Sequence, residues 1–229
     1  MKKILVIILG LILLLSLAGC SSSGNKQSSN NIPVENESVQ TADKMLSLAK
    51  DRNLTIQTTV DVGKTYSNID ELVKDSNIVI EGKIEEAKTT FNTFGIYTNA
   101  KIKIINSFEG VLKPGDVIAI TFRGGTIEGE DAKKQRMDII KEKFGTVDNN
   151  VSSEKTEEKV NGLDNLITGD NVLLFINSED NKYLVTGGYM GRFKITNDSV
   201  QLSEEFKDIY KAIKKDDFIK LIKDSVKKK

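Results

Sequence analysis

The chain has 229 residues, with 33 lysines and arginines, 33 aspartates and glutamates, and a formal net charge of zero. It contains no histidine, no tryptophan and one cysteine, which excludes imidazole catalysis, intramolecular disulfides and multi-cysteine zinc sites. The balanced charge gives no global basic field that would attract nucleic acid. The length fits one domain with an appendage.

The first twenty residues have the parts of an export signal. Lys2 and Lys3 precede an apolar run at residues 4–15, and the small residues Ala18 and Gly19 precede Cys20. The run is shorter than the ~20 apolar residues that a permanent membrane helix needs. Residues 1–19 are therefore predicted to be a signal peptide that is removed on export.

The residues around the expected cleavage point, Leu17-Ala18-Gly19-Cys20, resemble the lipobox of bacterial lipoproteins at every position. The resemblance implies cleavage between Gly19 and Cys20 and a diacylglycerol, with acyl chains such as palmitate, on the Cys20 sulfur. Two acyl chains give stable anchoring, because each buried CH₂ contributes about 0.8 kcal/mol. We expect lipidation of Cys20 and a protein anchored at the extracytoplasmic face of the cell membrane. The alternative is an ordinary signal peptide or short membrane anchor with an incidental cysteine.

The remaining chain divides into a tether, a body and a C-terminal segment. Residues 20–40 are rich in Ser, Asn and Gln, and too few apolar groups are present to offset the entropy of ordering them. We predict a flexible tether there, a β domain at 41–202 and a helical segment at 203–229. The β domain should begin with a short helix at 41–50 and an extended segment at 54–62.

The pattern of apolar residues predicts most of the elements of the body. A capped helix should start after Asn68, with Glu71 at capping-box spacing, and end near Asp75. Alternation predicts strands at 77–85 and 98–108, and a continuous apolar run predicts a central strand at 170–176. Further strands are predicted at 117–122, 182–186, 192–195 and 199–202. Residues 127–161 break the pattern, and we interpret them as a polar insertion with a short helix at 137–144 and a loop at 148–161.

The C-terminal segment has an apolar stripe at helical spacing. Phe206, Ile209, Tyr210 and Ile213 follow the possible cap Ser203, and a second stripe begins near Asp216 or Asp217. Such a stripe most often covers the domain's own core, although it can also lie on a membrane or a partner helix. The expected fold class is mainly β, an antiparallel barrel or sandwich, with C-terminal α-helices and α+β overall.

The order of these segments is similar to that in a known group of proteins. The helix and the strands at residues 75–84, 101–110, 115–125, 169–175 and 188–193 together resemble a small β-barrel-like domain of uncharacterised exported bacterial proteins. The resemblance covers residues 67–202, with 127–161 as an enlarged insertion. Its motifs are strands, tight turns and glycines, so it implies a fold and no catalytic residues.

Glycine turns next to arginines form the main candidate site. Arg123-Gly124-Gly125 and Thr186-Gly187-Gly188 each follow a predicted strand, and Gly191-Arg192 adds a basic residue. Glycine turns can expose backbone N–H groups to an anion, and arginine can complete such a site. Neither matches a phosphate-loop or dinucleotide fingerprint, and β-bulges or barrel corners are the preferred interpretation. The candidate anion-binding residues are Arg123, Gly124, Gly125, Gly187, Gly188 and Arg192.

Other patterns carry less chemistry. Four Ser-x-x-Lys matches lack the companion motifs of penicillin-recognising enzymes and are what chance produces in this composition. The carboxylate pairs Glu85/Glu86 and Glu157/Glu158 are interpreted as solvated surface, because adjacent strand residues point to opposite faces. Calcium at Asp164, Asp170 and Asp180 has no EF-hand spacing to support it, and turn chemistry explains these residues equally well.

These observations favour a non-enzymatic binding or interaction module at the cell envelope. We expect no cofactor, no metal, no catalytic residue and no nucleic-acid partner, with an envelope protein or polymer as the possible partner. One alternative is a hydrolase that acts on an envelope polymer without histidine, and another is an inhibitor- or chaperone-like partner of an exported protein. A cleft with convergent carboxylates would favour the enzyme, whereas a shallow groove or an unpaired strand edge would favour binding.

Overall fold

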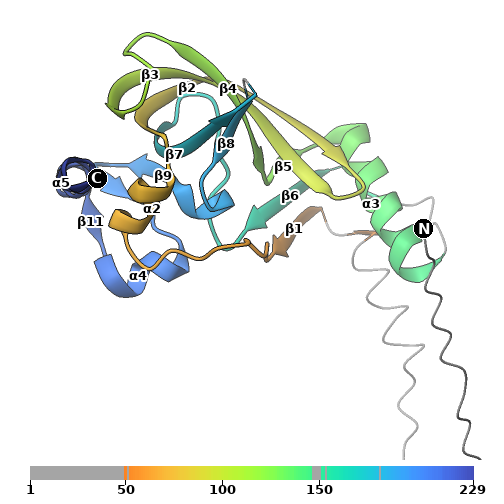
Figure 1. Cartoon of the computed structure of the whole chain (residues 1–229). Helices are drawn as coiled ribbons and strands as arrows, with labels where there is room; N and C mark the ends of the chain where they lie inside the picture. Colours follow the sequence, from red (N-terminus) through yellow and green to blue (C-terminus); the bar gives the residue numbers. More distant parts are fainter. Residues whose placement is uncertain (1–48, 51, 146–150, 153, 181) are drawn as a thin grey trace, which may run out of the picture. The chain divides into compact units, whose positions relative to one another are not determined.

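The structure is a computed structural model that describes residues 49–50, 52–145, 151–152, 154–180 and 182–229 (Figure 1). The predicted signal peptide at 1–19, Cys20 and the tether at 20–40 lie outside the described residues, as does most of the predicted helix at 41–50. The described residues form a mainly β, α+β fold with a large antiparallel sheet and a C-terminal helix, as expected from the sequence.

The large sheet has eight strands in the order β11-β10-β9-β7-β2-β3-β4, and β8 also pairs with β7. Its strands are β2 (Ile78–Asn92), β3 (Gly95–Glu109), β4 (Val117–Arg123), β7 (Asn171–Glu179), β8 (Lys182–Val185), β9 (Arg192–Thr196), β10 (Ser199–Val200) and β11 (Ile213–Lys214). All pairs in this sheet are antiparallel. One edge of β7 is shared, because β9 pairs with its first half and β8 with its second half.

Two apolar clusters lie on opposite faces of this sheet. The inner cluster gathers side chains of β2, β3, β4 and β7, among them Ile80, Ile102, Ile120 and Leu174. The sheet curls around this cluster so that β8 approaches β4, but these two strands do not pair. Within the described residues the strands therefore make a sandwich-like fold and no closed barrel.

The helix-side cluster covers the other face of the sheet. It packs β7 and β9 against α2 (Ile69–Asp75), α4 (Glu204–Tyr210) and α5 (Lys215–Lys228) (Figure 1). Phe193 lies at its centre, with ring centroids 5.6 Å from Phe175, 5.6 Å from Phe206 and 4.9 Å from Phe218. The C-terminal apolar stripe thus covers the domain's own core, as the preferred interpretation of the sequence has it.

One detail of the C-terminal prediction is wrong. The first stripe does not continue through one helix to Ile213, because α4 ends at Tyr210 and Lys211 turns the chain with a φ of 50°. Ile213 then pairs with Val200 in the sheet, and Ile209 remains 48% exposed. Pairing in a sheet thus replaces the last position of the helical pattern.

The cap of α2 forms where the sequence places it. Asn68 Oδ1 accepts a hydrogen bond from the Glu71 N–H at 2.9 Å, and Glu71 Oε2 accepts one from the Ser67 N–H at 3.0 Å. These bonds satisfy backbone donors that the first helical turn leaves unpaired. Ile69, Leu72 and Val73 of this short helix are buried in the helix-side cluster.

A second, smaller sheet forms the polar end of the molecule. It has the order β1-β6-β5, with β1 (Asn53–Thr58), β5 (Gly125–Ile127) and β6 (Lys155–Val160), and β1 pairs with β6 in parallel. The helix α3 (Gly129–Phe144) accompanies it and is fixed by the buried Arg136, which donates to Thr156 Oγ1 at 2.7 Å and to Lys155 O. We use "polar end" for β1, β5, β6 and α3.

The prediction of a loop at 148–161 and a short helix at 137–144 is wrong. The helix begins eight residues earlier than predicted, at Gly129, and residues 155–160 form the central strand of the smaller sheet. The strand alternates buried Thr156, Glu158 and Val160 with less buried Lys155 and Glu157. The pattern escaped the sequence analysis because two of its three inward positions are polar.

Candidate functional site

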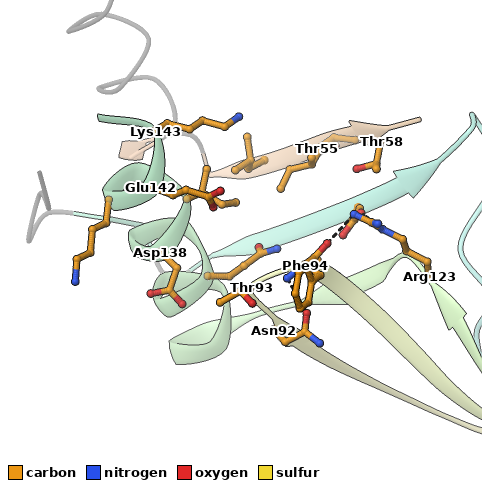
Figure 2. A pocket seen from close by; sticks show the side chains of 16 residues that line it. Thr55, Thr58, Asn92, Thr93, Phe94, Arg123, Asp138, Glu142 and Lys143 are labelled. Atoms are coloured by element: carbon orange, nitrogen blue, oxygen red, sulfur yellow. Dashed lines mark hydrogen bonds and ion pairs between the residues drawn. The ribbon is translucent and has the colours of Figure 1, made fainter. Parts of the chain in front are cut away.

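A cavity of about 880 Å³ lies at the polar end (Figure 2). Its volume is within the range of about 300–1,000 Å³ for ligand pockets. Four parts of the chain line it: β1, the turn between β2 and β3, residues 135–143 of α3, and one charged residue each from β4 and β6. We call this cavity the β1–α3 pocket. Its lining residues are Leu54, Thr55, Ile56, Thr58, Asn92, Thr93, Phe94, Gly95, Arg123, Gln135, Asp138, Ile139, Lys141, Glu142, Lys143 and Glu158.

An exposed aromatic ring stands at one side of the pocket. Phe94 lies in the turn that joins the two 15-residue strands β2 and β3, and it is 73% exposed. Asn92 Oδ1 accepts a hydrogen bond from the Phe94 N–H at 2.8 Å, which closes the turn on itself. Figure 2 shows Phe94 across the pocket from Thr55 of β1 and Asp138 of α3.

A partly buried ion pair, in which only the carboxylate is fully buried, holds that turn against the small sheet. Arg123 Nε donates to Glu158 Oε1 at 3.0 Å, and Arg123 Nη2 donates to the Phe94 carbonyl at 2.7 Å. Glu158 is 2% exposed, and its other oxygen accepts the N–H of Ile96 at 2.6 Å. Because both oxygens of this carboxylate are bound, the end of β4 and the turn are held in fixed positions relative to β6.

Gln135 contributes a polar group that has no partner among the residues that the structure describes. The side chain lines the pocket from α3 and is 4% exposed, yet its Oε1 is buried without a hydrogen bond. A buried acceptor in this state costs about 1–3 kcal/mol relative to a bonded one. Such a group in a pocket wall is a point at which a ligand can supply the missing donor.

The charges around the pocket balance. Arg123, Lys141 and Lys143 carry three positive charges, and Asp138, Glu142 and Glu158 carry three negative charges. The pair between Arg123 and Glu158 neutralises the two charges nearest the turn, and the four on α3 are exposed. The pocket therefore offers no excess of either sign to a ligand.

The structure disperses the six candidate anion-binding residues. Arg123 is in the β1–α3 pocket, where Glu158 engages it. Arg192 points instead into the inner cluster, with its guanidinium carbon 5.8 Å from the Phe122 ring centroid and Nη2 3.3 Å from the Asp164 carbonyl. Burial lowers the pKa of Arg192 to about 10. The two arginines lie on opposite sides of β4, because Phe122 and Arg123 alternate along it.

The glycines of that candidate site serve the path of the chain. Gly124 and Gly125 join β4 to β5, and a methyl group on Gly125 would lie 2.7 Å from both Thr89 Cγ2 and Thr98 Oγ1. Gly187 precedes η1 (Gly188–Gly191) and Gly188 is its first residue, at the point where the chain leaves β8 to reach β9. Gly187 has a φ of 62°, a backbone angle that favours glycine. A methyl group at this position would also lie 2.5 Å from Cε2 of the Tyr66 ring.

The carboxylates singled out in the sequence have separate roles. Glu86 pairs with Lys101 at 2.7 Å and with Lys88 at 2.7 Å, and these bonds lower its pKa to about 2. The interpretation of Glu157/Glu158 as solvated surface is wrong for Glu158, because the Arg123 guanidinium allows that carboxylate to be buried. Asp170 binds Lys194 at 2.8 Å and the N–H of Ile167, as a turn residue does.

Three pocket residues escaped the sequence analysis. Phe94 had a signal, since an aromatic residue within the polar turn Asn92-Thr93-Phe94-Gly95 is unusual in a turn. Gln135 and Glu158 had none, because their neighbours in space come from distant segments of the chain. In the part of the chain that the structure describes, no three His, Cys, Asp or Glu side chains are grouped to hold a metal ion.

Comparisons with known proteins do not identify a family for this chain. No family model matches the sequence, and no curated protein matches it. Among the described residues, no helix combines the length and the apolar character needed to cross a membrane.

Proposed function

We propose that the chain is an exported lipoprotein held at the outer side of the cell membrane by lipid on Cys20. Its folded domain is a non-enzymatic binding module, and the β1–α3 pocket is its binding site. The lipobox Leu17-Ala18-Gly19-Cys20 supports the anchor. The pocket supports the binding role, since it combines apolar walls with a few fixed polar groups.

The observation that carries the binding role is the placement of Phe94. Its side chain is 73% exposed beside the pocket, and its backbone N–H and carbonyl are held by Asn92 and Arg123, which fixes where the ring is presented. A turn fixed before binding loses little conformational entropy when a ligand covers it. The turn therefore has the properties of a preformed contact surface.

The anchor is tested by the variant Cys20→Ala in the producing cell. Metabolic labelling with a palmitate analogue should label the parent protein and leave the variant unlabelled. The variant should also be released from membranes or retain an uncleaved precursor. Normal processing and unchanged membrane retention of Cys20→Ala would refute the lipid anchor.

The binding site is tested with insoluble cell-wall material and the full chain in detergent. The parent protein should sediment with the material, and Phe94→Ala should lose about tenfold in affinity, which corresponds to about 1.4 kcal/mol. Val111→Ala is the matched control, because Val111 is an exposed apolar residue at 81% outside the pocket. Equal losses for both variants, or none for Phe94→Ala, would place the binding surface elsewhere.

A hydrolase acting on an envelope polymer is the second candidate. The observation in its favour is that Asp138 and Glu142 lie one helical turn apart on α3 and both line the pocket. Two such carboxylates can serve as acid and base when they flank a scissile bond. Release of reducing ends from cell-wall polymer that disappears in Asp138→Asn and Glu142→Gln would establish this function in place of binding alone.

A further inference from the structure

We propose that the ligand of the β1–α3 pocket is an oligosaccharide of N-acetylated amino sugars. The proposal rests on the proposed function, in which this pocket binds a component of the cell envelope. It goes beyond it by naming the chemical class of the ligand from the groups that line the cavity.

The first requirement on the ligand comes from Gln135. Its Oε1 has no hydrogen-bond donor among the described residues, and because the terminal torsion of a glutamine is broad, a rotation of the amide would turn that oxygen toward the cavity. An acetamido group carries an N–H that can meet this acceptor. Its carbonyl oxygen can in turn accept from the amide nitrogen of the same side chain or from a threonine hydroxyl.

The second requirement comes from the apolar residues of the same cavity. Leu54 and Ile56 of β1 and Ile139 of α3 line it, and all three are buried or half-buried. A methyl group beside an N–H matches an amide acceptor set among aliphatic side chains. The acetamido group contains both, whereas the hydroxyl groups of a plain hexose supply donors without a methyl group beside them.

The third requirement comes from the rim of the pocket. The C–H face of a pyranose ring packs well against an aromatic ring, and Phe94 presents such a ring in a fixed turn. Thr55, Thr58 and Asn92 supply hydroxyl and amide groups around it, which suit sugar hydroxyls. A volume of about 880 Å³ accommodates an oligosaccharide rather than a single sugar.

The balance of charge favours a neutral ligand. Three acidic and three basic side chains line the pocket, and the innermost pair, Arg123 and Glu158, is already neutralised. An extended peptide would depend on backbone hydrogen bonds along a strand edge. Within the described residues β1 is an edge strand of the smaller sheet and lines the pocket, so such a peptide is the competing ligand that the experiment must separate. The hydroxyl and amide side chains that come from several elements favour the hydroxyl-rich ligand.

The experiment is calorimetric titration of the full chain in detergent with three trisaccharides. These are the N-acetylglucosamine trimer, its deacetylated form and the glucose trimer with the same linkage. The acetylated trimer should bind about tenfold or more tightly than the other two, because they lack the acetamido N–H and methyl. Gln135→Leu should remove this preference, and Gln57→Leu should keep it, because Gln57 is an exposed residue of β1 outside the pocket.

If Gln135→Leu unfolds, Phe94→Ala serves as the second variant. The Phe94 side chain is exposed, so its removal should leave the fold intact, and affinity for all three trimers should fall. Equal affinity of the parent for the three trimers would overturn the proposal. So would displacement of pocket-bound cell-wall material by an unbranched alanine peptide and not by the acetylated trimer. Neither result would overturn the proposed function, as long as Phe94→Ala still weakens binding to cell-wall material. The proposed function is overturned only if Phe94→Ala leaves that binding unchanged.

Discussion

The large sheet and the polar end are stabilised in different ways. The large sheet is held by two clusters of aliphatic and aromatic side chains, one on each face. The polar end buries Arg136, Thr156, Glu158 and Gln135, which are between 0% and 4% exposed. Both ends belong to one compact unit, but only the polar end contains the β1–α3 pocket.

This difference shows what each kind of interior is suited to. Apolar packing has no direction, so it stabilises a sheet without fixing any one polar atom. Hydrogen bonds and ion pairs are directional, and a buried network fixes the groups that take part in it. The pocket occurs where the interior is polar, because a binding site needs fixed atoms more than it needs maximal stability.

The largest effect on stability should come from a cavity-forming substitution in the helix-side cluster. Phe193→Ala removes a ring that touches three other aromatic rings, and Phe193 is 1% exposed. We expect a loss of about 3–5 kcal/mol in the free energy of unfolding, measured by denaturant titration. The same change at Phe94 should cost less than about 0.5 kcal/mol, because that ring is exposed. Similar losses at both positions would contradict the contrast between the two regions.

A medium effect should come from the polar network. Glu158→Gln keeps the shape of the side chain but removes the charge that pairs with Arg123. We expect a loss of about 1.5–3 kcal/mol in stability, typical of a hydrogen bond to a charged group. The affinity for cell-wall material should fall as well, since the turn that carries Phe94 loosens. Glu157→Gln, at the neighbouring and less buried position, is the control and should change neither quantity.

The smallest effect on stability should come from acid titration of two aspartates of α2. Hydrogen bonds from Ser225 and Lys228 lower the pKa of Asp70, and a bond from Lys64 lowers the pKa of Asp75. Both carboxylates therefore stabilise the fold above their unfolded pKa of about 3.9, and this stability is lost as pH falls through the lower folded values. Each should contribute less than about 1 kcal/mol, because both are partly exposed.

The measurement is unfolding by denaturant between pH 6 and pH 2. Asp70→Asn and Asp75→Asn should flatten the acid limb of the stability curve by lowering its neutral part, by less than about 1 kcal/mol each, and should leave its most acidic part nearly unchanged. A parent curve that is already flat below about pH 4 would contradict this account.

The sequence predicted the apolar half of this fold well and the polar half poorly. Strands with aliphatic side chains, such as the alternating 117–122 and the continuous apolar run at 170–176, lie where the pattern predicts them. The predicted end of β2 at residue 85 is too early, because a bulge at Glu85 reverses which positions face inward. Ile84 precedes the bulge and Ala87 follows it, and both face the inner cluster. A pattern of strict alternation cannot follow such a change of phase.

The pocket was beyond the reach of the sequence for a related reason. It is built from residues 54–58, 92–95 and 135–143 with Glu158, and no local pattern links these segments. Arg123 was singled out for an anion, but its partner is a carboxylate of the same chain, from a strand that sequence reasoning treated as a loop. Pairing of opposite charges across distant segments is a property of the fold, so it becomes visible only in three dimensions.

The Arg123 guanidinium also sets the order in which the molecule can assemble. This guanidinium binds both the Phe94 carbonyl in the turn at 92–95 and the Glu158 carboxylate in β6. The bond between Ile96 N–H and the same carboxylate joins residues that are 62 positions apart in the sequence. Contacts of large sequence separation close long loops, so they form after neighbouring strands have paired. The bond between Ile96 and Glu158 is therefore expected to form after β3 and β4, which are neighbours in sequence, have paired. The backbone amide of Ile96 should accordingly exchange its hydrogen with solvent sooner than the paired amides at the centre of β3 and β4.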